Sequence, residues 1–239
     1  MHVKHVKSIA ACLAAACAAW PGHAAAQIRI AVVGPMTGHY EALGRQMRTG
    51  AEQAVADLNA AGVREAMSEG YTPGQSDYSA LVGRMKAAGI TAVYLGGYYA
   101  EAATIARQSK AAGLSAPIVG GDALVTDGFW KASGEAGAGT MMTFPADPRR
   151  IPAAAAVVRR FQARKVDPEG YTLYAYAAVQ VWAQAAAKAA SADGFKTAAA
   201  LRSGTWSSVL GPVSFDRKGD VAGGGWVMYV WKAGSYQQM

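Results

Sequence analysis

Apolar residues along the chain form short continuous runs that alternate with longer segments of helical spacing. The runs that end at or near glycine or proline have the pattern of strands buried on both faces of a sheet. They cover residues 28–34, 90–97, 116–122 and 138–145. Helices are predicted between them at 45–60, within 72–89 and at 100–113. This alternation favours an α/β fold with a parallel, doubly wound sheet.

The pattern changes after residue 150. Two helices are predicted at 151–165 and 171–190, separated by the breaker "KVDPEG", and a short third helix at 194–204. The end of the chain alternates apolar and polar residues. "GPVSFD", the turn "RKGD" and "GGWVMYVWKAG" together predict a hairpin.

The first 26 residues have the features of a secretory signal peptide. Lys4 and Lys7 precede an apolar stretch of about 13 residues, and alanines 24–26 supply a small-residue cleavage pattern. A bilayer-spanning helix needs roughly 20 apolar residues, so this stretch is too short to anchor the chain. A soluble, exported protein is therefore expected. Cys12 and Cys17 lie within this segment, so neither a disulfide nor a thiol nucleophile is expected after cleavage.

Charge and motif content argue against several classes of function. The net charge of +7 falls to +5 without the two signal lysines, and the remaining basic residues are scattered without interleaved aromatics, so no nucleic-acid partner is expected. His39 is the only histidine beyond residue 26, and no HExxH, GxxxxGK[ST] or GxSxG motif occurs. No catalytic residue, metal site or cofactor is predicted, although an enzyme is not excluded.

Three predicted loops carry residues suited to holding a small molecule. Tyr98 follows one glycine pair after a strand, Asp122 follows a second pair, and Tyr171 begins a helix after "DPEG". Ligands of open α/β sheets lie beyond the carboxyl ends of strands, and aromatic rings with a carboxylate suit an ammonium group beside an apolar tail. Each feature also has a structural explanation: glycine turns, a helix cap and tyrosines that fill the core. Together they predict a pocket for a zwitterion with a hydrophobic side chain.

Several longer stretches resemble one known family. They are "IRIAVVGPMTG", "GAEQAVADLNAAG", "GQSDYSALVGRMKAAGITAVYLGGYYAEAATIARQSKAAGL", "VGGDAL" and "GPVSFDRKGD". In these the chain is similar to the periplasmic leucine/isoleucine/valine-binding proteins, the soluble receptors of branched-chain amino-acid ABC importers. The resemblance implies the type I periplasmic binding fold, in which two doubly wound lobes close over a ligand.

The resemblance also implies roles for the candidate residues. In the family, a tyrosine after the glycine pair and an acid after the next strand contact the amino acid, and the acid pairs with its ammonium. These roles map onto Tyr98 and Asp122, with aspartate in place of the usual glutamate. An aromatic residue that lines the pocket maps onto Tyr171. Some members have a tyrosine in the first loop where this chain has Leu43.

Against the family pattern, the first lobe is expected to be incomplete. "DLNAAG" resembles the end of the first helix, whereas the next residues resemble a stretch deep in the second lobe, so residues 60–63 are interpreted as a seam. The predicted organisation is a signal peptide at 1–26, the start of the first lobe at 27–63, and a partial second lobe at 64–150. Helices and a terminal hairpin at 151–239 span the hinge and lobes. Strand 28–34 is expected to lack neighbours, with exposed sheet edges.

The resemblance implies a periplasmic, monomeric, non-enzymatic receptor with two partners, an amino-acid ligand and the membrane permease of an ABC importer. Other functions stay open. The chain could be a remnant that binds nothing, an exported enzyme on a similar sheet, or a receptor for an amide, urea or an aromatic acid.

Overall fold

The computed structural model describes residues 29–35, 41–59 and 64–239. The predicted signal peptide at 1–26, His39 and the proposed seam at 60–63 lie outside these residues. Leu43 belongs to a described helix, but its side chain is outside the description.

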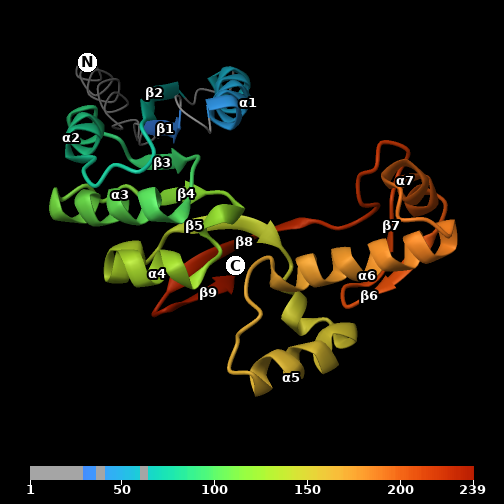
Figure 1. Ribbon diagram of the computed structural model, residues 1–239. Helices are drawn as coiled ribbons and strands as arrows, with labels where there is room; N and C mark the ends of the chain where they lie inside the picture. The colour runs from blue at the N-terminus through green and yellow to red at the C-terminus, as the bar shows by residue number, and fades with distance from the viewer. Residues whose placement is uncertain (1–28, 36–40, 60–63) are drawn as a thin grey trace, which may run out of the picture.

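A seven-stranded sheet, mostly parallel, forms the centre of the protein (Figure 1). Its strands are β1 (Arg29–Pro35), β2 (Arg64–Tyr71), β3 (Ala92–Leu95), β4 (Ile118–Gly120), β5 (Met141–Pro145), β8 (Trp226–Lys232) and β9 (Ser235–Gln238). They lie in the order β2-β1-β3-β4-β5-β8-β9. The first five are parallel, and β8 and β9 add antiparallel strands at one edge. The order β2-β1-β3-β4-β5 is a common doubly wound arrangement, which agrees with the predicted fold class.

Strand β1 is paired along both edges. Ala31, Val32 and Val33 are at most 3% exposed, between β2 on one side and β3 on the other. The expectation that strand 28–34 lacks neighbours is therefore wrong. Its continuous apolar run suits a central parallel strand, because both faces are covered. Residues 27–63 and 64–150 thus contribute strands to one sheet, and their assignment to two different lobes stays a prediction.

Helices pack beside the strands and build one main core. They are α1 (Glu41–Asn59), α2 (Ser79–Ala87), α3 (Tyr99–Ala111) and α4 (Asp127–Ser133). Figure 1 shows α1 on one side of β1 and β2, and α2 on the other. The core includes Met85 of α2, Ile105 of α3, Phe129 of α4 and Trp231 of β8, all fully buried. Helical spacing of apolar residues thus predicts α1, α2 and α3 correctly.

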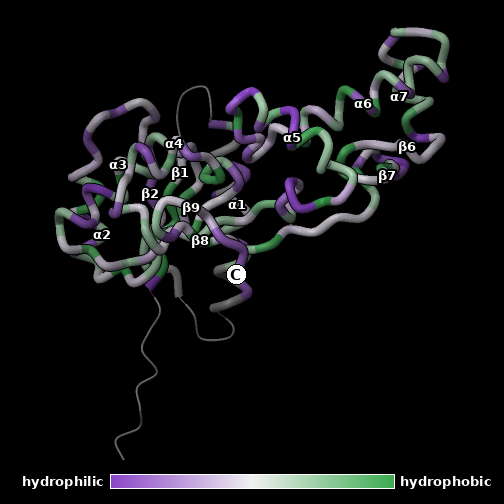
Figure 2. The backbone as a smooth tube through the Cα atoms, turned by 90° about the horizontal axis from the view of Figure 1, so that it is seen from below, coloured by the Kyte–Doolittle hydropathy of each residue, from purple (hydrophilic) through white to green (hydrophobic). Residues whose placement is uncertain are grey.

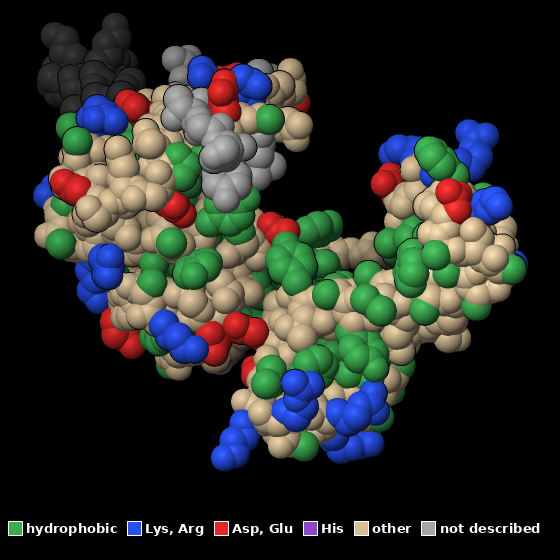
Figure 3. All heavy atoms as spheres, viewed as in Figure 1, with side chains coloured by type: hydrophobic (Ala, Val, Ile, Leu, Met, Phe, Trp, Pro, Cys, Tyr) green, Lys and Arg blue, Asp and Glu red, His purple; other side chains and the backbone are tan. Residues whose placement is uncertain are grey.

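The rest of the chain forms an extension that we call the helical arm. It comprises α5 (Ala155–Ala163), α6 (Thr172–Ala189), α7 (Gly194–Arg202) and the two-stranded sheet of β6 (Thr205–Ser208) and β7 (Gly211–Ser214). Figures 1 and 2 show α6, α7 and this small sheet reaching away from the main sheet. Hydrophobic side chains lie on the surface over α6 (Figure 3), and the helices α6 and α7 carry three large exposed ones. They are Val179 (67%), Trp182 (48%) and Phe195 (90%).

The predicted terminal hairpin forms only at its turn, where Phe215 and Val221 make an antiparallel bridge, and the pairing predicted for the two strands beyond it is wrong. Strand β7 pairs with β6 in the arm, whereas β8 pairs with β5 and β9 in the main sheet. Alternating apolar residues identify each strand but do not identify its partner. The chain leaves the arm through Gly223 and Gly224, whose φ values of 79° and 96° favour glycine.

Candidate functional site

A cavity of about 760 Å³ opens at the carboxyl ends of β3 and β4, where loops of a doubly wound sheet converge. All three residues predicted to bind ligand, Tyr98, Asp122 and Tyr171, line this one cavity. Its other lining residues are Tyr94, Gly97, Tyr99, Gly121, Ala123, Val125, Thr126, Thr143 and Trp226. The fold thus brings together residues from loops up to 73 positions apart, as the sequence hypothesis requires.

Asp122 enters the cavity from a short 3-10 helix that directly follows β4. A Cβ atom on Gly120 would lie 2.4 Å from Cδ1 of the buried Leu124, so this position needs glycine for packing. In turn, the carbonyl of Leu124 accepts a hydrogen bond of 3.0 Å from the indole of Trp231. Gly120 is thus required by the core, whereas a Cβ atom on Gly121 would meet nothing within 4 Å. Asp122 follows this pair at the end of β4.

Tyr98 is the residue before α3, with an extended backbone, and its side chain is 37% exposed. A Cβ atom on the preceding Gly97 would lie 1.7 Å from the phenol oxygen of Tyr71. That buried phenol donates to the carbonyl of Gly96 over 3.3 Å. As at Gly120, glycine is needed here because a core side chain fills the space. Gly97 and Gly120 thus have a packing role.

Tyr171 is the residue before α6 and reaches the cavity from that helix, not from the loops after β3 and β4. Its phenol donates a hydrogen bond to Oδ2 of Asp122. Its ring packs edge-on against Phe144 of β5, with centroids 5.1 Å apart. Burial, followed by the hydrogen bond to Asp122 and the charge of that residue, raises the pKa of the Tyr171 phenol. The phenol therefore keeps its proton and stays a donor to the carboxylate.

The other tyrosines of this helix lie elsewhere. The Tyr174 phenol donates to the carbonyl of Ala146, and burial raises its pKa to about 12. Tyr176 accepts a hydrogen bond from Arg160. Of the tyrosines at the start of α6, Tyr171 alone lines this cavity.

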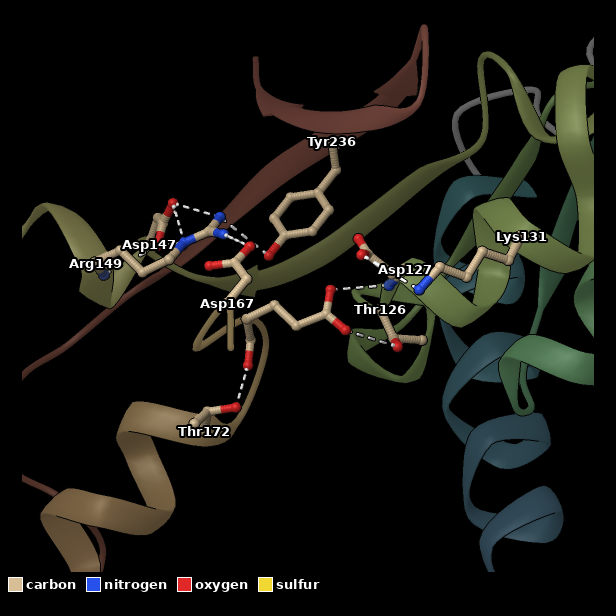
Figure 4. Close-up of polar contacts among 9 residues, drawn as sticks. Thr126, Asp127, Lys131, Asp147, Arg149, Asp167, Thr172 and Tyr236 are labelled. Atoms are coloured by element: carbon tan, nitrogen blue, oxygen red, sulfur yellow. Dashed lines mark hydrogen bonds and ion pairs between the residues drawn. The ribbon is translucent and has the colours of Figure 1, made fainter. Parts of the chain in front are cut away.

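A polar network that the sequence did not reveal joins two walls of the cavity. The carboxylate of Glu169 accepts hydrogen bonds from Thr126 Oγ1 (3.4 Å) and from the backbone N–H of Asp127 (2.9 Å). Nearby, Lys131 forms an ion pair with Asp127 over 3.8 Å (Figure 4). Burial, and after it the neighbouring Asp127, raises the pKa of the Glu169 carboxyl despite the hydrogen bond from the Asp127 N–H.

A second cluster fixes the turn that carries Glu169. Arg149 pairs with Asp147 (2.9 Å) and Asp167 (2.8 Å) and donates to the phenol of Tyr236 on β9 over 3.3 Å (Figure 4). Burial alone would raise the pKa of Asp147, but hydrogen bonds from Arg149 outweigh it and hold that pKa below its usual range. The "DPEG" turn signals only a loop in the sequence, so these long-range contacts left no local pattern to find.

The described residues hold neither a cluster of metal ligands nor a helix that could span a membrane. In 29–35, 41–59 and 64–239, no three His, Cys, Asp or Glu side chains come together in a way that could hold a metal ion. No described helix combines the length and apolar character needed to cross a bilayer.

The fold and the cavity define a binding protein of the doubly wound α/β class. The model of the periplasmic binding protein family matches residues 60–235, so the chain belongs to that family. This agrees with the resemblance seen in the sequence.

Curated relatives carry consistent names. The chain is 42% identical to "Leu/Ile/Val-binding protein homolog 1" of Brucella suis biovar 1 over 186 residues, which are 77% of this chain and 50% of that protein. It is 41% identical to "Amino acid binding protein" of Pseudomonas aeruginosa over 192 residues, which are 79% and 51%. The chain thus spans about half the length of these relatives. Both are named as binding proteins, which agrees with the prediction that the chain is not an enzyme.

Solved structures show the same fold. The leucine-binding protein LivK from Thermotoga maritima aligns with a TM-score of 0.74 and 23% identity, over 88% of this chain and 59% of that one. The branched-chain amino-acid transporter substrate-binding protein LivJ from Streptococcus pneumoniae, solved with isoleucine, aligns with a TM-score of 0.72 and 19% identity, over 88% and 60%.

Proposed function

We propose that this chain is the solute-binding component of an ABC importer for branched-chain amino acids. The observation that carries the proposal is the position of Asp122, a carboxylate on the wall of a cavity lined by several aromatic rings. An amino acid with an apolar side chain matches both features, because its ammonium pairs with a carboxylate and its side chain contacts the rings. The names of the curated relatives point to the same ligand class.

The chemistry of binding starts from the contact that already exists in the cavity. The phenol of Tyr171 donates to one oxygen of Asp122. A carboxylate accepts several hydrogen bonds, so the ligand ammonium joins that phenol at Asp122. Tyr98 and Trp226 extend the apolar wall on which the ligand side chain packs. The protein carries out no reaction, since binding and release are its whole activity.

Location and partner follow from the same family. We infer that the chain acts in the periplasm after removal of residues 1–26 and delivers its ligand to a membrane permease. We also keep the hypothesis that the first lobe is incomplete. In that case the ligand carboxylate has fewer donors than in the full-length relatives, and a buried, poorly satisfied charge weakens affinity by several kcal/mol.

Isothermal titration calorimetry of the purified protein with L-leucine tests the proposal. Saturable binding with a stoichiometry near one, and competition by isoleucine and valine, is the expected result. Acetamide, urea and benzoate serve as competing ligands for the other classes left open by the sequence. Absence of heat and of any leucine-dependent rise in melting temperature would favour a remnant that binds nothing.

A further inference from the structure

Glu169 connects two walls of the cavity without lining it. Its carboxylate lies against the start of α4, where Thr126 and the backbone N–H of Asp127 donate to it. Its own carbonyl accepts from the side chain of Thr172 over 2.7 Å and from that residue's N–H over 3.1 Å, at the first turn of α6. Thr126, one of these donors, and Tyr171, which lies between Glu169 and Thr172 in the chain, both line the cavity.

The charge on Glu169 is opposed by its surroundings. Burial is the largest cause of its raised pKa, and the carboxylate of Asp127 adds repulsion. Lys131 from α4 faces Asp127, and the Tyr236 phenol from β9 lies near enough to Glu169 that its own pKa is raised in part by it. Arg149 pairs with Asp167 in the same turn.

The raised pKa of Glu169 means that its ionised form lowers the stability of the folded chain. Because the pKa of Glu169 is higher in the folded chain than in the unfolded one, the folded chain binds a proton more readily. Stability therefore falls as pH rises from the unfolded pKa through the folded one, and the ionised group subtracts from stability at neutral pH. A carboxylate that costs stability and makes two contacts across a cavity suits a role in the site.

We propose that Glu169 is a positioning residue of the ligand site. Its carboxylate holds the Tyr171 turn against the 122–126 segment, at the spacing at which the Tyr171 phenol reaches Asp122. The inference rests on the proposed function, since it concerns the geometry of the same cavity. It also gives the site a pH response. Protonation of Glu169 weakens the two hydrogen bonds that its carboxylate accepts from Thr126 and Asp127. The distance between the Tyr171 turn and the 122–126 segment is therefore held less firmly at acidic pH.

The test compares three proteins, namely the wild-type chain, Glu169→Gln and the control Glu135→Gln. Glutamine keeps the length of the side chain and one acceptor oxygen but removes the charge. Glu135 is exposed and lies outside the cavity, so its change controls for loss of one negative charge. Leucine affinity is measured by calorimetry from pH 4.5 to 8, and melting temperature is measured at the same pH values.

For Glu169→Gln we expect about tenfold weaker leucine binding at pH 7.5, as for loss of one charge-assisted hydrogen bond. Its melting temperature should equal or exceed that of the wild-type chain at this pH. The difference in affinity should shrink as pH falls, because the wild-type carboxyl becomes protonated while Asp122 is common to both proteins. Thr126→Val removes one of the two contacts and should weaken binding in the same direction.

Unchanged leucine affinity in Glu169→Gln would overturn the inference while leaving the proposed function intact. A parallel loss of melting temperature and affinity would also overturn it, since that result indicates a purely structural role. Failure of the wild-type protein itself to bind leucine would instead remove the proposed function on which the inference rests. An equal effect from Glu135→Gln would assign the change to net charge and not to position 169.

Discussion

Replacing Asp122 with asparagine removes the negative charge from the cavity and keeps the size of the side chain. At about 4 Å from a ligand ammonium and an effective dielectric constant near 20, the Coulomb attraction is about 4 kcal/mol. Desolvation offsets part of it, and charge-assisted hydrogen bonds are worth about 1.5–3 kcal/mol net. A loss near the upper end corresponds to leucine binding that is weaker by about 100-fold.

The fold should tolerate this change. The asparagine side-chain oxygen can still accept from the Tyr171 phenol, so the free energy of unfolding should drop by less than about 1.5 kcal/mol. The assay is calorimetry with L-leucine and with 4-methylpentanoate, which has the same apolar chain and carboxylate but no amine. Asp122→Asn should weaken leucine binding and leave the second ligand equal or improved. If leucine binds the variant as tightly as it binds the wild-type chain, the site assignment is refuted.

Two further perturbations test the packing and the electrostatics that support the cavity. Gly97→Ala forces a Cβ against the Tyr71 phenol and should lower the free energy of unfolding in urea melts by about 1–3 kcal/mol. The control is Gly83→Ala in α2, where a Cβ has no neighbour within 4 Å. That change should raise the free energy of unfolding by up to about 1 kcal/mol. Arg149→Met should cost about 2 kcal/mol of stability at pH 7, because it leaves the largely buried Asp147 carboxylate unpaired. Since the pKa of Asp147 is lowered, its contribution to stability is present above its unfolded pKa and is lost as pH falls through its folded pKa. Arg149→Met should therefore lose less stability on acidification than the wild-type chain. Parallel plots of stability against pH for the two proteins would contradict this.

Sequence patterning predicted strands with a continuous or alternating apolar pattern and helices with an apolar stripe. Strand β1 is apolar from Ile30 onward, and its residues from Ala31 to Pro35 are buried. Strand β2, "REAMSEGY", was not predicted because it lies at the sheet edge and carries charged residues. The pairing of β8 with β5 was missed because strands 81 residues apart in the chain, at Pro145 and Trp226, leave no mark of partnership in local sequence. Alternation of apolar residues indicates that a strand forms, and its position in the sheet depends on the whole chain.

Local sequence signals pointed to the residues that line the cavity but not to Glu169, which lies beside it. Tyr98, Asp122 and Tyr171 stand out because each follows a strand end or a helix breaker, where side chains reach solvent. Glu169 stands in the middle of a loop motif, and its role depends on contacts with residues more than 40 positions earlier. Residues that position others therefore need coordinates to be recognised, whereas residues at strand ends are visible in sequence.

The two sides of the cavity are anchored to different parts of the molecule. The Asp122 segment is tied to the main core, since the fully buried Trp231 donates to the carbonyl of Leu124. The Tyr171 turn belongs to the start of the helical arm, and Arg149 holds it through Asp167. The cavity thus lies where the arm joins the sheet. Tyr171 and Asp122 meet across this junction, so their hydrogen bond joins the arm to the main sheet at the wall of the cavity.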